Sequence, residues 1–179
     1  EIKPDYAEAY NNVGIALEDK GDLEEAINSY KKALEIKPDY AEAYNNIGII
    51  LQEKSDLVSA IKSYEIAIKI KPNFADAYYN LGNAHKENSN LKKAISSYKM
   101  TLDIQPNSSD AYLNMGIALN NLGDLEAAII CYKNTLKINP SYTEAYFNMA
   151  ITLKSQGNLE VALDNFKQAL KINTNYAPA

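Results

Sequence analysis

Apolar residues in positions 1–40 recur at spacings of three and four, which is the period of an α-helix with one buried face. The first set predicts one helix and consists of Ala7, Tyr10, Val13, Gly14 and Leu17. The second set predicts another helix and consists of Ala26, Ile27, Tyr30, Ala33 and Leu34. The stretch between the two sets is short and polar, so we expect the two helices to pack against each other as an antiparallel pair.

Short polar residues mark where these helices begin and end. Asp22 is predicted to cap the second helix, with Glu25 as its capping-box partner three residues later. Pro38 stops that helix, because proline cannot continue it. Asp39 is then predicted to cap the next first helix, with Glu42 as its box partner.

The turn inside each pair favours a left-handed residue, and Gly21 suits that conformation. Ser55 and Ser89 stand at the same place in the second and third pairs. A residue other than glycine costs roughly 1 kcal/mol there. We therefore expect those two turns to be looser or differently shaped.

The whole pattern repeats every 34 positions along the chain. Residues 1–12 return unchanged as residues 35–46, and looser copies start at Ala75, Ser109 and Thr143. The period predicts units at 7–40, 41–74, 75–108, 109–142 and 143–176, with the tail of another unit at 1–6 and the start of one at 177–179. A period of this length is typical of stacked helix pairs that form one continuous solenoid domain. The chain lacks an initial Met and is cut inside a repeat at both ends, so we expect a segment of a longer array.

Composition narrows the class of partner. Hydrophobic residues make up 46% of the chain and charged residues 23%, so a core is able to form. The net charge of −5 argues against nucleic acid, and no apolar run approaches the roughly 20 residues of a membrane helix. The single cysteine, Cys131, excludes an internal disulfide framework and fits a reducing compartment, so we expect a cytoplasmic location.

The recurring positions resemble the tetratricopeptide repeat (TPR) family over essentially the whole chain. In the first unit these positions are Tyr10, Val13, Gly14, Leu17, Ala26, Tyr30, Ala33 and Pro38. Mild departures from the family pattern are Thr101, Thr135, Ala150, His85 and Thr174. The resemblance implies an all-α fold, a right-handed α-solenoid of antiparallel helix pairs whose first helices line a concave wall.

Small and large residues of the pattern have separate packing roles. Gly14 and Ala26 let the two helices of a unit approach closely, and Ala33 lets the second helix receive the first helix of the next unit. Tyr10 and Tyr30 fill the space between. We therefore interpret the tyrosines that recur at these two positions as packing residues rather than as a binding surface.

Asparagine occupies one position in every unit, two residues after the first large aromatic, at Asn12, Asn46, Asn80, Asn114 and Asn148. That offset turns the side chain away from the core face, and Asn is a mediocre helix former. Neither core packing nor helix propensity therefore explains an Asn at this position. The Asn amide carries one acceptor and two donors, so a row of them suits the backbone of an extended peptide. The alternatives are that each Asn contacts the neighbouring repeat or reflects a compositional bias.

An acid precedes each of these asparagines by four positions, at Glu8, Glu42, Asp76, Asp110 and Glu144. The combined pattern is similar to the superhelical TPR arrays of O-linked N-acetylglucosamine transferases, in which an Asn ladder grips substrate backbone and a row of acids reads side chains. The resemblance implies a peptide-binding role for Glu8, Glu42, Asp76 and Asp110, but no activity, because the catalytic domain is absent. The alternative for the acids is helix capping at the positive start of each first helix.

The residue before each Asn changes from polar to apolar along the chain: Asn11, Asn45, Tyr79, Leu113 and Phe147. We expect Tyr79, Leu113 and Phe147 to form apolar side pockets of a groove, since exposed aromatic and aliphatic side chains in a concavity are common binding anchors. Contact with the adjacent helix is the alternative for each of them.

A second peptide-binding mode of the family holds a C-terminal carboxylate with basic residues from several first helices. The corresponding positions here carry Asn11, Ile15, Glu42 and Asp76, so that basic clamp is missing. An acidic row repels an acidic C-terminus. We therefore expect a protein or peptide ligand in extended conformation that is neutral or basic.

Catalysis has little support in the sequence. His85 occupies a framework position, and Cys131 lies beside Tyr132 on a packing face, where a buried and inert thiol is expected. The sequence contains no Cys/His cluster and no glycine-rich phosphate loop. We predict no enzyme activity, no catalytic residue, no metal site and no cofactor.

The first hypothesis is therefore a protein–protein interaction scaffold that binds an extended peptide through the Asn row. The second is a self-assembling repeat protein, because Leu163, Phe166 and Leu170 are expected to lie partly open and a repeat end without a polar cap tends to find another copy. The third is the substrate-recognition arm of a larger enzyme, such as a glycosyltransferase.

Overall fold

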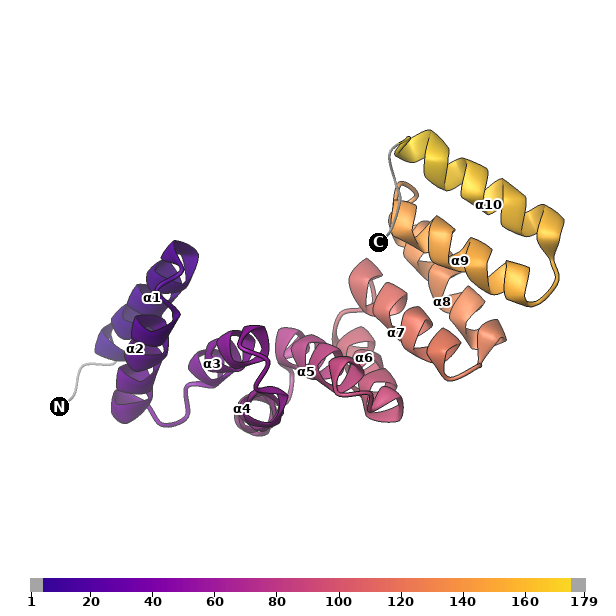
Figure 1. The fold of residues 1–179 in the computed structure, drawn as a ribbon. Coiled ribbons are helices and arrows are strands. Elements are labelled where there is room, and N and C mark those ends of the chain that lie inside the picture. Colours follow the sequence, from indigo (N-terminus) through magenta and orange to yellow (C-terminus); the bar gives the residue numbers. More distant parts are fainter. Residues whose placement is uncertain (1–4, 175–179) are drawn as a thin grey trace. The chain divides into compact units, whose positions relative to one another are not determined.

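The structure is a computed structural model that describes residues 5–174, so the expected segment at 177–179 and most of the segment at 1–6 lie outside it. The described residues form α-helices joined by short turns, with no strand among them (Figure 1). The helices are α1 (Asp5–Lys20), α2 (Leu23–Ile36), α3 (Ala41–Glu53), α4 (Leu57–Ile70), α5 (Ala75–Glu87), α6 (Leu91–Ile104), α7 (Ser109–Asn121), α8 (Leu125–Ile138), α9 (Thr143–Ser155) and α10 (Leu159–Ile172). The predicted all-α class is confirmed.

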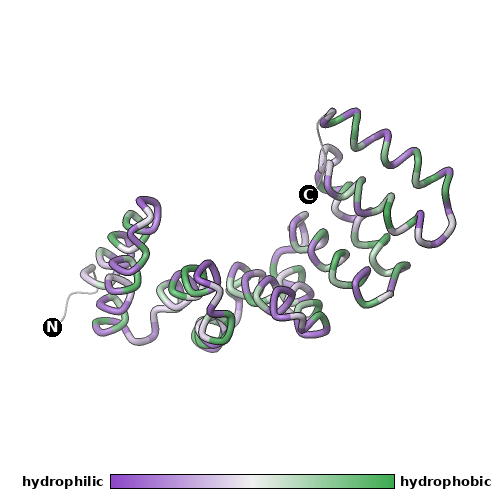
Figure 2. Tube along the Cα trace, in the orientation of Figure 1, coloured by the Kyte–Doolittle hydropathy of each residue, from purple (hydrophilic) through white to green (hydrophobic). Residues whose placement is uncertain are grey.

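The described chain divides into two compact units, one up to Asn88 and one from Ser89 onward, and each is described by itself. In the first unit α1 packs against α2 and α3 against α4, and α5 packs on α4. In the second unit α7 packs against α8 and α9 against α10, and α6 packs on α7. Hydrophobic and hydrophilic stretches alternate along each helix, as amphipathic packing requires (Figure 2).

Glycine in the first helix makes room for a tyrosine of the second, as the sequence predicted. A Cβ on Gly14 would lie 2.4 Å from Cε1 of Tyr30, and one on Gly48 would lie 2.5 Å from Cε1 of Tyr64. Neither tyrosine ring is exposed to solvent. The interpretation of Tyr30, Tyr64, Tyr98 and Tyr132 as packing residues is confirmed, because all are at most 1% exposed.

Each second helix also packs against the first helix of the following pair. Ala26, Tyr30 and Ala33 of α2 form one cluster with Ala43 and Ile47 of α3. In the second unit, Ile129 and Tyr132 of α8 cluster with Ala145, Met149 and Leu153 of α9. These junctions bury the apolar faces that a single helix pair leaves open.

The expectation of a looser turn at Ser55 and Ser89 is wrong. Ser55 and Ser89 have φ of 62° and 59°, in the same left-handed region as Gly21 at 86°. The Ser55 turn is closed by N–H donation from Ser55 to Gln52 and from Asp56 to Leu51, at 2.8 and 2.9 Å. Gly21 and Asp22 make the same two bonds to Glu18 and Leu17, at 2.9 and 2.8 Å. The serine therefore adopts the left-handed conformation at a conformational cost.

The predicted capping of the first helices by Asp39 is also wrong. The N-cap residue of α3 is Tyr40, whose side chain makes no capping bond. Asp39 lies in the preceding turn, which the Tyr40 N–H closes by donating to the Lys37 carbonyl at 3.2 Å. Glu42 is consequently the second residue of α3 rather than the third, and it acts on the helix start through its charge.

The second helices follow the prediction more closely. Asp22, Asp56 and Asp124 are the N-cap residues of α2, α4 and α8. The Asp56 carboxylate accepts from the Ser59 N–H at 3.1 Å, and Asp124 accepts from Ala127 at 3.2 Å. The Asp22 side chain instead pairs with Lys20 at 2.5 Å.

Candidate functional site

The first helices of the N-terminal unit, α1, α3 and α5, present a stripe of residues that turns away from the second helices. We call this surface the first-helix face. It consists of Glu8, Asn12, Ile15, Asp19, Glu42, Asn46, Ile49, Glu53, Asp76, Asn80, Asn83 and Glu87. All of these side chains are exposed or half-buried, half of them are acidic and none is basic.

Asparagine side chains form a hydrogen-bonded chain across this face. Asn46 Nδ2 donates to Asn11 Oδ1 at 3.3 Å, and Asn80 Nδ2 donates to Asn45 Oδ1 at 3.0 Å. Asn45 Nδ2 in turn lies 3.4 Å from Asn46 Oδ1, which links the two bonds. Asn11 and Asn45 are 4% and 6% exposed, whereas Asn46 and Asn80 are half-buried. Asn46 and Asn80 of the Asn row therefore do contact the neighbouring repeat. Their side chains are also partly exposed at the surface.

Buried tyrosines of the second helices α2 and α4 extend their hydroxyl groups toward the first helices. Tyr30 Oη donates to Glu18 Oε2 of α1 at 2.8 Å, and Tyr64 Oη donates to Gln52 Oε1 of α3 at 3.0 Å. Burial raises the pKa of Tyr30 above its usual range, and the Glu18 carboxylate adds to the rise. Burial likewise raises the pKa of Tyr64, and the Glu87 charge adds to it. Both hydroxyls thus stay protonated and serve as donors.

A hollow of about 380 Å³ opens in this face between α3 and α5. Gln52 Nε2 donates to Glu87 Oε1 across it at 2.6 Å. Its walls combine an aliphatic side chain, amides, a phenol and carboxylates, and they consist of Ile49, Gln52, Glu53, Tyr64, Asn80, Asn83 and Glu87. This composition suits the side chain of a polar or cationic residue.

The acids at the starts of the first helices contact the chain that follows them. Glu42 pairs with Lys71 at 2.6 Å, and in the C-terminal unit Asp110 accepts from Tyr142 Oη at 2.6 Å. Burial acts to raise the pKa of Glu42, but the bond from Lys71, the bond from the Glu42 backbone N–H and the charges of Lys71 and Lys37 together outweigh it, so the net shift is downward. Burial, with Glu8 and Glu42 nearby, raises the pKa of Tyr40. Glu8 and Asp76 are exposed.

The remaining members of the Asn row differ from Asn46 and Asn80. Asn12 is exposed on α1. In the C-terminal unit, Asn114 Nδ2 donates to the Asp110 carbonyl of its own helix at 3.2 Å, and the Asn148 carbonyl accepts from Thr152 Oγ1 at 2.9 Å. An interrepeat bond of that unit joins Thr152 Oγ1 to Asn120 Oδ1, at 2.9 Å.

The three expected apolar pocket residues do not share one environment. Leu113 is 3% exposed and belongs to the core cluster with Ala145 and Met149, so it is a core residue and not a pocket wall. Phe147 is half-buried, with its ring centroid 5.6 Å from that of Phe166 in an edge-to-face arrangement. Tyr79 is half-buried on α5. Packing against the adjacent helix, the alternative for these positions, thus holds for Leu113 and also for Phe147, because Phe166 belongs to α10.

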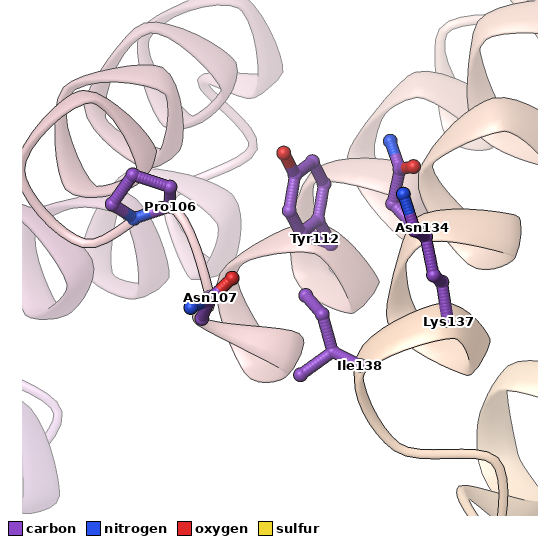
Figure 3. A pocket seen from close by; sticks show the side chains of 6 residues that line it. All are labelled: Pro106, Asn107, Tyr112, Asn134, Lys137 and Ile138. Carbon is purple, nitrogen blue, oxygen red and sulfur yellow. The ribbon is translucent and has the colours of Figure 1, made fainter.

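A second hollow, of about 430 Å³, lies in the C-terminal unit, and its lining residues include none of the predicted site residues. Figure 3 shows Tyr112 of α7 facing Asn134, Lys137 and Ile138 of α8, with Pro106 and Asn107 from the preceding turn. Tyr112 precedes Asn114 by two residues, so this hollow opens on a different side of α7 from the Asn row.

His85 and Cys131 are buried, as expected from their framework positions, at 5% and 4% exposed. Burial raises the pKa of the Cys131 thiol to about 11, so the thiol is protonated at neutral pH. Within residues 5–174 no group of His, Cys, Asp and Glu side chains is arranged to hold a metal ion. No helix among those residues is both long enough and apolar enough to cross a membrane.

Sequence reasoning missed the part of the site that comes from the second helices. Tyr30 and Tyr64 were assigned to packing alone, yet their hydroxyls bond to Glu18 and Gln52 of the first helices, and Tyr64 also lines the hollow in the first-helix face. Gln52, Glu53 and Glu87 were not singled out either. The signal was present, because a glycine beneath each tyrosine leaves the ring a path toward the first-helix side.

Family models identify the chain. Models described as TPR repeat match residues 16–55 and 51–89, and models described as tetratricopeptide repeat match residues 75–108 and 107–175. The matches cover most of the chain, so it belongs to the tetratricopeptide repeat family. No curated protein sequence matches it.

Solved structures agree with this assignment. A crystal structure of MamA is 27% identical with a TM-score of 0.86, over 90% of this chain and 95% of MamA. A crystal structure of YrrB, a TPR protein with an unusual peptide-binding site, is 26% identical with a TM-score of 0.81, over 93% of this chain and 86% of YrrB. The pilF protein of Pseudomonas aeruginosa shares the fold at 20% identity and a TM-score of 0.85, over 94% of this chain and 77% of that one. The predicted α-solenoid class is confirmed, and the family and fold support a protein-interaction scaffold.

Proposed function

We propose that the first-helix face of α1, α3 and α5 binds an extended peptide, with Asn46 and Asn80 hydrogen-bonding to the peptide backbone. The observation that carries the proposal is the asparagine chain beside the hollow between α3 and α5. Asn46 bonds with Asn11, Asn45 and the Tyr30 hydroxyl and keeps one of the four hydrogen-bonding positions of its amide for a ligand, and Asn80, which bonds with Asn45, also keeps capacity.

The interrepeat bonds favour binding rather than compete with it. They hold the amides of Asn46 and Asn80 in one orientation before a ligand arrives, which lowers the entropic cost of binding. The contact with the neighbouring repeat and the peptide ladder are therefore compatible roles of the same side chains.

Charge on the first-helix face sets the class of ligand. Its acids include Glu53, Asp76 and Glu87, together with Glu42, whose charge Lys71 offsets in an ion pair, and none of its own residues is basic. Like charges repel and opposite charges attract across such a surface, so the ligand is neutral or basic. The hollow beside Glu53 and Glu87 receives a cationic side chain of the peptide. The peptide-binding neighbour YrrB supports this use of the fold.

An array of short synthetic peptides graded in net charge tests the proposal. We expect neutral and basic peptides to be captured and acidic ones to be rejected. Each backbone hydrogen bond contributes about 1 kcal/mol, so the Asn46→Ala/Asn80→Ala variant is expected to bind about tenfold more weakly or worse. Unchanged capture by this variant contradicts the proposal.

Asn11→Ala is the matched control, because it removes the partner of the Asn46 bond and leaves Asn46 itself in place. Equal losses for Asn11→Ala and Asn46→Ala show that the asparagines act only by holding the repeats together. A larger loss for Asn46→Ala is the expected result. Far-UV circular dichroism checks that each variant is folded.

A narrower alternative rests on the Asn row with an acid four residues before it. This pattern supports a resemblance to the arrays of O-linked N-acetylglucosamine transferases, in which the chain is the substrate-recognition arm of a larger enzyme. Sequencing the adjoining coding region tests the alternative. A glycosyltransferase domain there supports it, and a different neighbouring domain contradicts it.

A further inference from the structure

Two carboxylates line the hollow between α3 and α5, and none of its lining residues is basic. Glu53 is the last residue of α3, and Glu87 is the last residue of α5. Both are exposed, so a ligand can reach them from solvent. Tyr64 also lines the hollow but is itself fully buried. The hollow is therefore acidic where it meets solvent and closed where it meets the tyrosine.

A chain of hydrogen bonds positions the Glu87 carboxylate. Tyr64 Oη donates to Gln52 Oε1 at 3.0 Å, and Gln52 Nε2 donates to Glu87 Oε1 at 2.6 Å. The raised pKa of Tyr64, caused by burial and then by the Glu87 and Glu18 charges, keeps its hydroxyl protonated and a donor. The Gln52 amide oxygen is thereby held toward Tyr64 and its N–H toward Glu87. The Glu87 carboxylate keeps further lone pairs for a ligand.

The charges of the two carboxylates are not neutralised within the chain. Among residues 5–174, the structure places neither Glu53 nor Glu87 in an ion pair. Lys54, which follows Glu53 in the sequence, pairs instead with Glu24 of α2. Because an opposite charge stabilises a carboxylate, the hollow has an electrostatic need that a cationic ligand meets.

The corresponding place between α7 and α9 carries no acid. These two first helices contact each other, as α3 and α5 do. The residues in phase with Gln52, Glu53 and Glu87 are all neutral there: Asn120, Asn121 and Ser155. Contact between neighbouring first helices therefore does not require carboxylates at these positions, which favours a role for Glu53 and Glu87 in binding.

Arginine suits this hollow better than lysine. Its planar guanidinium carries five N–H donors in a fixed fork, so one group can bond to the Glu53 and Glu87 carboxylates together. The ammonium of lysine is a compact charge with three donors, and it is more strongly hydrated, so it loses more on entering a partly enclosed site. Ile49 on the wall of the hollow offers an apolar surface to the aliphatic stem of the ligand.

We propose that the hollow between α3 and α5 is a subsite for one arginine side chain of the bound peptide, with Gln52 as a positioning residue. The inference rests on the proposed function, in which Asn46 and Asn80 hold the peptide backbone. Asn80 lines the hollow and also donates to Asn45 at 3.0 Å, so the subsite lies beside the asparagine chain. The arginine subsite gives sequence preference to a surface whose asparagines hold backbone alone.

N-acetyl-L-arginine amide tests the subsite without an extended peptide. In heteronuclear NMR spectra of the 179-residue chain, we expect it to shift the side-chain amide resonances of Gln52 and Asn80. N-acetyl-L-lysine amide should need about tenfold higher concentration, because it makes fewer charge-assisted hydrogen bonds. N-acetyl-L-citrulline amide, which has a similar shape and no charge, should leave the resonances unchanged. Equal titrations with the arginine and lysine probes overturn the proposal.

A matched pair of variants tests whether the carboxylate in the hollow is responsible. Glu87→Gln should weaken the arginine titration about tenfold or more, because it removes a charge-assisted contact. Glu65→Gln makes the same change in net charge at an exposed residue of α4 outside the hollow, and it should titrate like the unaltered chain. Equal losses in both variants mean that only overall charge matters, and the subsite is then wrong.

Gln52→Met tests the positioning role, because methionine is of similar size and makes neither bond of the amide. We expect the preference for arginine over lysine to fall, since the Glu87 carboxylate is no longer held in place, while the lysine titration changes little. An unchanged preference removes Gln52 from the proposal. A lysine titration like that of the unaltered chain shows that the hollow is still formed.

Peptides distinguish failure of the subsite from failure of the peptide site. Two neutral-flanked synthetic peptides that differ only in a central Arg or Ala should both bind more weakly to Asn46→Ala/Asn80→Ala. Glu53→Asn/Glu87→Ser, which gives the hollow the residues found between α7 and α9, should weaken only the arginine peptide. If it weakens both peptides equally or neither, the subsite proposal is wrong and the peptide site stands. If Asn46→Ala/Asn80→Ala weakens neither, the peptide site is wrong.

Discussion

Adding one methyl group at Gly48 tests whether the contact between glycine and tyrosine determines how closely the helices of a pair approach. Gly48 lies inside α3, where alanine is the better helix former by about 1 kcal/mol. On helix propensity alone, Gly48→Ala stabilises the protein. The structure predicts the opposite sign.

The new Cβ would lie 2.5 Å from Cε1 and 2.8 Å from Cδ1 of Tyr64, closer than carbon atoms approach. The ring cannot swing aside, because Tyr64 is fully buried and its hydroxyl is bonded to Gln52 at 3.0 Å. Overpacking of this kind costs about 1–3 kcal/mol. Subtracting the propensity gain leaves a net destabilisation of about 1 kcal/mol.

Urea denaturation followed by far-UV circular dichroism measures the change. Ala16→Gly, at an exposed position of α1, gives the helix-propensity difference in this chain. Gly48→Ala/Tyr64→Leu removes the ring, and we expect it to recover part of the loss relative to the sum of the single changes. A higher denaturation midpoint for Gly48→Ala alone refutes the argument.

Two further predictions concern the turns and the thiol. Ser55→Gly should raise the free energy of unfolding by about 1 kcal/mol, because φ is 62° at Ser55, whereas Ser96→Gly inside α6 should lower it by about 0.5 kcal/mol; equal effects in urea denaturation contradict this. With a pKa of about 11, Cys131 should react with a thiol reagent at pH 8 at least about 100-fold more slowly in the folded chain than in urea, and faster as the pH approaches 11. Equal rates in folded and unfolded protein show that the thiol is not held in the core.

The helix pairs could be predicted from sequence because their determinants lie within one repeat. Gly48 and Tyr64 are separated by a fixed number of residues, and their contact follows once two helices pair. The left-handed turn at Ser55 was the exception. There, the bonds that close the turn determine the backbone conformation despite the residue type.

Features that depend on the stagger between helices could not be predicted. A single repeat does not show whether Leu113 faces solvent or the following helix pair, and the structure buries it. The Asn46–Asn11 bond likewise joins side chains 35 residues apart, one more than the period. The N-cap residue of α3 is Tyr40, one residue later than the expected Asp39, because Asp39 lies in the turn between α2 and α3.

The bonds between repeats in the asparagine chain all run one way. Asn80 donates to Asn45 and Asn46 donates to Asn11, so each first helix offers an N–H to the helix before it. The row of asparagines therefore has a direction along the stacked first helices. An extended peptide also has a direction, since its N–H and C=O groups follow in a fixed order, and it meets different partners when turned end for end. Under the proposed function, we therefore expect the side-chain amides to select the orientation of a bound peptide, independently of which residues the peptide carries.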